Sequence, residues 1–219
     1  MLLDKAKMNS GKFMFNQKEK TLLFANNLWY LSEGMLGPLF GVYCARFHSS
    51  PLDISWVWAL YLISVGVVVM VLGYLSDYLQ KEKLLISGYA MQTLLTFCYL
   101  LVDSKTELAV LQIALGISGG LSTTTWYALY SRYEDKSKEG LTWGLANGLA
   151  SIYTGVALLT GGFIISMGSF ELLFITMGIV QFCATIYVTR LLYFIPRKQS
   201  AENNIKIEVK ELIKSVDLQ

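Results

Sequence analysis

The feature that most constrains this chain is a series of long segments with almost no charged residues. A helical membrane span needs roughly 20 mostly apolar residues to cross about 30 Å of hydrocarbon. Hydrophobic residues make up 54% of the sequence and charged residues 16%, a more apolar balance than soluble domains have. Six segments qualify as spans: 21–45, 54–76, 84–102, 107–130, 141–166 and 170–195.

Each of these spans is predicted to be an α-helix. Backbone amides that face lipid need internal hydrogen bonds, which a helix supplies within one segment. The alternation of apolar and polar residues that is typical of membrane barrel strands is absent. The sequence therefore predicts an all-α polytopic membrane protein. Its expected parts are an N-terminal segment (1–20), a six-helix bundle (21–195) and a C-terminal tail (196–219).

The basic residues between the spans predict how the chain is oriented. Lysine and arginine gather in the cytoplasmic loops of membrane proteins. If the N-terminus is cytoplasmic, all of the 18 lysines and arginines except Arg46 and Lys105 lie in inner segments. We therefore predict a plasma-membrane protein with both termini in the cytoplasm. The net charge of +2 gives no indication of a nucleic-acid partner.

Glu33 is the one acidic residue well inside a predicted span. A carboxylate there costs about 2.5–3.5 kcal/mol on insertion scales, so it is expected to face protein or water. Asn26 and Tyr30 precede it at helical spacing and lie on the same face. We predict that these three residues bind a substrate or a proton in a central cavity. The alternative is a buried carboxylate that pairs with a polar neighbour. Gly37-Pro38 then bends the helix.

The fourth and fifth spans carry further candidates for a solute path. Gln112 and Trp126 lie on the fourth span and Asn147 on the fifth, and the Trp126 ring is expected to stack on a substrate. The hydroxyls at 122–125 either line this path or bond back to their own helix. The fifth span also carries small residues along one face, which predicts close helix packing there. These residues are Gly144, Gly148, Ser151, Gly155 and Gly162.

The segment 73–83, Gly-Tyr-Leu-Ser-Asp-Tyr-Leu-Gln-Lys-Glu-Lys, joins the second and third spans. It resembles the loop between the second and third helices of major facilitator superfamily (MFS) transporters. In that loop a Gly-x-x-x-Asp pattern is followed by a basic residue, a glycine and further basic residues. Tyr78 and Gln80 stand where the family has its first basic residue and its glycine. The resemblance implies a gating role for the residues that fit: Gly73, Asp77, Lys81 and Lys83.

Other features extend the resemblance over about residues 15–195. The Gly37-Pro38 kink and the glycine-rich fifth span are similar to features of the family. Gln112 precedes Gly116 by four residues, where proton-coupled members often have an arginine. The resemblance implies the N-terminal six-helix half of an MFS fold, a 3+3 inverted repeat. In such a half the first and fourth helices lie at the cavity and the third and sixth at the periphery.

The implied function is a secondary transporter, or half of one, that moves a small solute by alternating access, with a proton as a possible coupled ion. Alternating access needs two bundles, so we expect a homodimer or a second half-transporter. The alternative is a non-transporting MFS-derived membrane scaffold or regulatory subunit. An enzyme is not expected: residues 116–119 read Gly-x-Ser-Gly, as in rhomboid proteases, but the only histidine, His48, lies in an outer loop. No cofactor or metal site is predicted.

Overall fold

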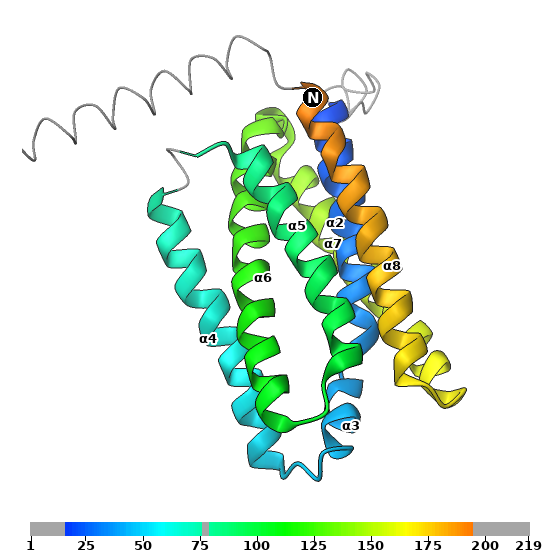
Figure 1. Ribbon diagram of the computed structural model, residues 1–219. Coiled ribbons are helices and arrows are strands. Elements are labelled where there is room, and N and C mark those ends of the chain that lie inside the picture. The colour runs from blue at the N-terminus through cyan, green and yellow to red at the C-terminus, as the bar shows by residue number, and fades with distance from the viewer. Residues whose placement is uncertain (1–15, 76–78, 195–219) are drawn as a thin grey trace, which may run out of the picture.

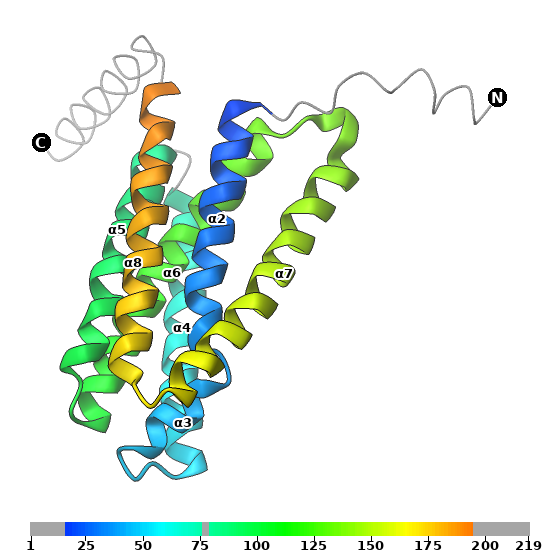
Figure 2. The same ribbon diagram turned by 90° about the vertical axis from the view of Figure 1, so that its right-hand side faces the viewer.

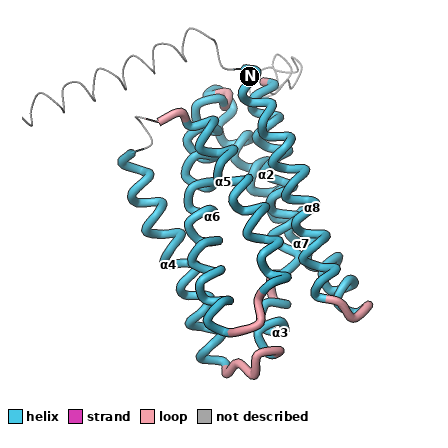
Figure 3. The backbone as a smooth tube through the Cα atoms, in the orientation of Figure 1, coloured by secondary structure: helices cyan, strands magenta, loops and turns pink. Residues whose placement is uncertain are grey.

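The structure is a computed structural model that describes residues 16–75 and 79–194. All regular elements in these residues are helices (Figure 3). Asp77, residues 1–15 of the predicted N-terminal segment and the predicted C-terminal tail lie outside the described residues. The prediction of an all-α chain is therefore confirmed for the part of the chain that the structure describes.

The helices follow the six predicted spans closely. The first span is broken at Gly37-Pro38, because proline has no backbone N–H to continue the helical hydrogen bonds. Short 3₁₀ segments, η2 (Tyr99–Leu101), η3 (Lys136–Lys138) and η4 (Thr189–Phe194), adjoin the longer helices. The α-helices are α2 (Gln17–Leu36), α3 (Leu39–Ala45), α4 (Pro51–Leu75), α5 (Lys81–Cys98), α6 (Lys105–Tyr133), α7 (Glu139–Ser166) and α8 (Phe170–Val188).

Five of the described segments are long and apolar enough to cross a membrane: Pro51–Tyr74, Lys81–Leu101, Lys105–Tyr133, Lys136–Ser166 and Phe170–Leu192. Helix α2 runs alongside them (Figures 1 and 2) but is less apolar. Its polarity comes from Lys18, Glu19 and Lys20 at its start and from Asn26, Asn27 and Glu33 further on. Together with α3 it forms the remaining predicted span.

Helices α2 and α6 form the centre of the bundle. Helix α2 packs on α7 and α8, α6 packs on α4 and α5, and α5 packs on α8. The outermost helices are α4 and α7. Of the 18-residue apolar stretch in each span, only 6% is buried for α4 and 17% for α7, whereas 56% is buried for α6. Figure 2 shows α7 diverging from α2 toward the start of α7. Because α4 and α7 share no substantial contact, the surface between them exposes parts of α2 and α6. We call this the α4–α7 face.

Glycines set the closest helix contacts, though not where the sequence predicts them. On α6, a Cβ at Gly120 would lie 2.9 Å from the carbonyl oxygen of Val65 in α4. On α7, Gly161 lies against the backbone of Met35 in α2. The predicted packing face of α7 is different: a Cβ at Gly144, Gly148, Gly155 or Gly162 would meet no described atom within 4 Å. That face therefore has no packing partner within the described residues.

Candidate functional site

Two cavities divide the six residues predicted to bind substrate or proton. Asn26, Tyr30, Trp126 and Asn147 line one cavity with Trp29, Tyr89, Ser122, Thr123, Tyr127, Ala146 and Ala150. Glu33 and Gln112 line the other with Leu36, Gly37, Trp58, Tyr61, Gln92, Thr96, Tyr99, Leu115 and Met177. We call them the Tyr127 cavity and the Glu33 cavity. The volume open to the centre of a water molecule is about 40 Å³ in the Tyr127 cavity and about 50 Å³ in the Glu33 cavity. Each therefore has room for a few water molecules.

The predicted polar stripe of the first helix runs past both cavities. Asn26 and Tyr30 reach the Tyr127 cavity, and Glu33 reaches the Glu33 cavity. The 3.6-residue repeat places residues four and seven apart on one side of a helix. The structure thus confirms that Asn26, Tyr30 and Glu33 share a face of α2. It also places Asn26 and Tyr30 in a different cavity from Glu33.

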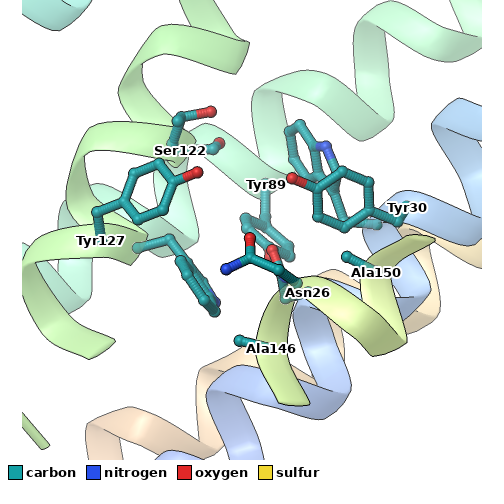
Figure 4. A pocket seen from close by; sticks show the side chains of 11 residues that line it. Asn26, Tyr30, Tyr89, Ser122, Tyr127, Ala146 and Ala150 are labelled. Carbon is teal, nitrogen blue, oxygen red and sulfur yellow. The ribbon is translucent and has the colours of Figure 1, made fainter. Parts of the chain in front are cut away.

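The Tyr127 cavity is aromatic and polar but carries no charge. Figure 4 shows Asn26 and Tyr30 of α2 opposite Tyr127 of α6, with Ala146 and Ala150 of α7 on a third side. None of its eleven lining residues is acidic or basic. Tyr30 and Tyr127 are 36% and 44% exposed as whole residues, so both remain accessible to a bound molecule. Aromatic rings and neutral hydrogen-bonding groups are what a neutral, ring-containing ligand requires.

Trp126 forms a wall of this cavity rather than a mobile platform. Its Nε1 donates to the carbonyl oxygen of Leu22 at 3.2 Å, and its ring stacks on Tyr130 with centroids 4.6 Å apart. Its side chain is only 6% exposed. The neighbouring Tyr127 is more open, so it is the ring best placed to contact a ligand. The hydroxyl of Ser122, which also lines the cavity, is buried and has no hydrogen-bond partner among the described residues.

The threonines beside this cavity mostly bond to their own helix. Thr124 Oγ1 donates to the carbonyl oxygen of Gly120 at 2.9 Å, and Thr125 Oγ1 donates to that of Leu121 at 2.6 Å. Thr124 and Thr125 therefore have the second of the two roles expected for these hydroxyls, which is to bond back to their own helix. Thr123 is exposed and lines the cavity.

In the Glu33 cavity the carboxylate is held by neutral groups. Gln92 Nε2 of α5 donates to Glu33 Oε1, and Ser118 Oγ of α6 donates to Gln92 Oε1. No lysine, arginine or histidine among the described residues forms an ion pair with Glu33. An ionised carboxylate away from water is costly unless it is paired or protonated. This environment suits a group that exchanges a proton or receives a cationic partner.

Gln112 is engaged with protein on the far side of the same cavity. Its side chain is 1% exposed, and its Nε2 donates to the hydroxyl of Tyr99 at 2.9 Å. Tyr99 in turn accepts, through its backbone oxygen, a hydrogen bond from the hydroxyl of Tyr43 at 3.2 Å. Gln112 is thus tied into the aromatic cluster formed by Tyr43, Tyr99 and Phe174, whose last two rings stack at 4.6 Å.

Gln92 contacts Glu33 directly but is not among the residues that the sequence predicts for the site. The signal was present: Gln92, Thr93 and Thr96 are polar residues in the middle of the third predicted span. All three are buried, and Thr93 contacts Thr185 of α8 at 2.9 Å. A polar residue within an apolar span faces protein rather than lipid, so it is a candidate for a site even when uncharged.

Three of the four predicted gating residues lie at the end of the bundle where α2 begins. Gly73 is exposed in the last turn of α4, and Lys81 and Lys83 lie in the first turn of α5. Asp77, between them, falls outside the described residues. Their gating role therefore stays a prediction.

Comparison with known proteins identifies the family. The Major Facilitator Superfamily profile matches residues 22–216, which is most of the chain. The chain belongs to this superfamily of transporters, and its described helices fit half of the MFS fold as a multi-pass membrane protein. The expectation drawn from the loop at 73–83 is confirmed at the level of the family.

Three relatives show how much of a transporter the chain spans. It is 24% identical over 171 residues to the uridine/deoxyuridine transporter of Lactococcus lactis, covering 77% of this chain and 35% of the relative. It is 21% identical to the MFS-type transporter MJ1560 of Methanocaldococcus jannaschii, covering 83% and 46%. It is 18% identical to the MFS-type transporter YitZ of Bacillus subtilis, covering 74% and 98%. The chain thus matches less than half of two relatives and nearly all of the third.

Proposed function

We propose that this chain is one six-helix half of a secondary transporter that moves a small solute across the plasma membrane by alternating access. Both termini lie in the cytoplasm in this proposal, as the distribution of basic residues indicates. The observation that supports the transporter proposal is the Tyr127 cavity. There α2, α6 and α7 bring together four residues that the sequence predicts for the solute path: Asn26, Tyr30, Trp126 and Asn147.

The solute that suits this cavity is neutral and contains a planar ring. The cavity offers the exposed residues Tyr30 and Tyr127 for stacking, and the Asn26 amide and the Asn147 amide oxygen for hydrogen bonds. The Asn147 Nδ2 donates to the carbonyl oxygen of Trp143 in its own helix at 2.9 Å. Charged solutes would find no counter-charge among its lining residues. The relative named a uridine/deoxyuridine transporter makes a pyrimidine nucleoside the first compound to test.

A proton is the proposed coupled ion, and Glu33 is its site. Glu33 lies in the separate cavity, where its hydrogen-bond partner is the neutral Gln92. Separate sites allow the carboxyl to gain or lose a proton without touching the solute. In this proposal Gly73, Asp77, Lys81 and Lys83 act in the gate at the cytoplasmic end.

The second half is proposed to be another copy of the chain, docked on the α4–α7 face. That face exposes Tyr127 and Asn147, and a Cβ added at Gly144, Gly148 or Gly155 of α7 would meet no described atom within 4 Å. Small residues at a helix surface allow another helix to approach closely. A second copy there would enclose the Tyr127 cavity and give it the depth that a solute needs.

The same glycine face favours a second candidate function. A scaffold or regulatory subunit that transports nothing would use Gly144, Gly148 and Gly155 to hold a different membrane protein. A flux assay separates the two functions, because only a transporter moves solute by itself.

The test is uptake of labelled uridine by the purified chain in liposomes, with and without a pH gradient. The transporter proposal predicts saturable uptake that unlabelled nucleosides inhibit, and a particle with the protein mass of two chains in mild detergent. A panel of sugars, amines and amino acids tests other solutes. No saturable uptake of any compound by a monodisperse dimer would contradict transport and favour the scaffold.

A further inference from the structure

We propose that Gln92 is a positioning residue that links the protonation of Glu33 in α2 to Ser118 in α6, by turning its side-chain amide around. This inference rests on the proposed role of Glu33 as a proton site. The three residues come from three helices, and Gln92 lies between the other two. Its side chain is 1% exposed and that of Ser118 is fully buried, so neither exchanges partners with bulk water.

The recorded hydrogen bonds fit the state in which Glu33 is ionised. A carboxylate only accepts hydrogen bonds, so the amide must present its NH₂ group to it. Gln92 Nε2 accordingly donates to Glu33 Oε1, and Gln92 Oε1 then faces the other way. Ser118 Oγ donates to that oxygen. Glu33 Oε1, both polar atoms of the Gln92 amide and Ser118 Oγ each have a hydrogen-bond partner when the carboxyl carries no proton.

Protonation of Glu33 reverses what the amide must offer. A neutral carboxyl has an O–H that needs an acceptor, and the Gln92 carbonyl can supply it only if the amide turns by about half a circle. The Gln92 NH₂ group then faces Ser118 Oγ, which must accept. The single hydrogen of Ser118 needs another acceptor in that state. The carbonyl oxygen of Leu115 provides one, since Ser118 Oγ already lies 3.3 Å from it.

The single hydroxyl hydrogen of Ser118 thus has two acceptors within reach. It goes to Gln92 Oε1 when Glu33 is ionised and to the carbonyl oxygen of Leu115 when Glu33 is protonated. The proton itself goes only to and from the Glu33 carboxyl. What passes through Gln92 to α6 is a reversal of hydrogen-bond direction. A side chain that only donates or only accepts cannot do this, whereas the Gln92 amide carries both a donor and an acceptor.

The surroundings leave Glu33 as the group that titrates. The titratable side chains close enough to act on it are Tyr30 of α2, Tyr61 of α4 and Tyr99 of η2. Phenols keep their proton at physiological pH. Helices α5, α6, α7 and α8 bring no acidic or basic side chain to it among the described residues.

The far end of this line lies where α6 meets α4. Ser118 falls between Gly116 and Gly120, the two glycines against which the backbone of α4 packs. One turn further along α6 is Ser122, in the wall of the Tyr127 cavity. A change in hydrogen bonding at Ser118 therefore acts on the contact between α4 and α6 and on the helix that carries solute-binding residues.

The test is infrared difference spectroscopy of the full chain in lipid, titrated over pH. A protonated-carboxyl band that is lost in Glu33→Gln identifies Glu33, and isotope-labelled glutamine reports the amide carbonyl. In the unsubstituted chain we expect the amide band to shift at the same pH as the carboxyl band. In Gln92→Met, which keeps the shape and removes the amide, the midpoint should rise by about one to two pH units, because a hydrogen bond to the charged form is lost.

Gln112→Met is the matched control, because Gln112 is also a buried glutamine in this cavity but bonds Tyr99. It should leave the midpoint of the Glu33 band unchanged. Ser118→Ala should leave the carboxyl band and change the size of the amide shift, because the Gln92 carbonyl then loses its donor in the ionised state of Glu33. If Gln92→Met does not fold, Gln92→Asn keeps an amide that is too short to reach both partners and should uncouple the two bands.

Three results would overturn the inference. They are an unchanged midpoint in a folded Gln92 variant, an equal shift in Gln112→Met, or an amide band that ignores pH in the unsubstituted chain. The spectra do not depend on transport, so linked bands in a chain without uptake would uphold the link and contradict only the proposed function. Absence of any titrating Glu33 band would overturn both the link and the proton role.

Discussion

Gly161 of α7 lies directly against the backbone carbonyl of Met35 in α2. The approach is so close that a Cβ on residue 161 would overlap the carbonyl oxygen. The next residue, Gly162, would meet nothing within 4 Å if it carried a Cβ. Two adjacent glycines therefore differ in role: the first sets the contact between α2 and α7, and the second lies on the open side of α7.

This contrast predicts the effect of adding a methyl group at each position. Gly161→Ala should lower the free energy of unfolding by about 1–3 kcal/mol, because the helices must move apart to admit the Cβ. Gly162→Ala should be neutral or slightly stabilising, since alanine favours helix. Thermal unfolding of both variants in detergent measures the difference. Equal losses of stability would contradict the assigned contact.

Glu33→Gln is expected to abolish the dependence of uptake on a pH gradient while leaving solute binding in place. The substituted amide cannot take or release a proton, and the Tyr127 cavity does not include residue 33. Uptake at several pH values, together with solute binding measured without a gradient, checks both parts. An unchanged pH dependence would show that another group binds the proton.

Tyr127→Ala should weaken binding of a ring-containing solute by roughly two- to tenfold. Stacked aromatic pairs contribute about 0.5–1.5 kcal/mol beyond the area they bury. The control is Tyr74→Ala, which removes a 78% exposed tyrosine near the end of α4. Calorimetric titration with the transported solute compares the two variants. Equal weakening in both would remove Tyr127 from the binding site.

Gln181→Leu should stabilise the protein. Gln181 of α8 is fully buried, and neither its oxygen nor its nitrogen has a hydrogen-bond partner in the described structure. A buried polar group without partners costs about 1–3 kcal/mol, which an apolar side chain of similar size avoids. A higher unfolding temperature with unchanged uptake is the expected result. A lower unfolding temperature would indicate that the amide holds a water molecule or a ligand.

The stability of the end of the bundle where α2 begins should depend on Glu19. Burial raises the pKa of this carboxyl above its ordinary value of 4.5, with smaller contributions from Glu134 and Asp135. The folded chain then binds the proton more strongly than the unfolded chain. Stability contributed by this group is greatest below pH 4.5 and is lost as the pH rises toward the folded pKa.

Glu19→Gln removes that loss, so its gain in unfolding temperature over the unsubstituted chain should grow from pH 4 toward neutral pH. Glu139→Gln is the control, because Glu139 is exposed in the first turn of α7. Thermal scans of the three proteins across this range give the comparison. A gain that shrinks with rising pH would contradict the sign.

The helices, their order and the family could be predicted from the sequence. Apolar length decides what crosses a membrane, and each helix satisfies its own backbone, so 107–130 predicts α6 (Lys105–Tyr133) without knowledge of its neighbours. Helical spacing likewise predicted that Asn26, Tyr30 and Glu33 share a face, because a 3.6-residue repeat is local.

The tertiary structure alone decided which side chains meet. The glycines of α7 read as one packing face, yet only Gly161 contacts α2, because contact depends on the position and rotation of a second helix. The pairing of Gln92 with Glu33 joins residues 59 positions apart on different helices, and no periodicity encodes such a pair. The separation of Glu33 from the Tyr127 cavity has the same origin: the sequence determined the face of α2, and the neighbouring helices divided that face into two cavities.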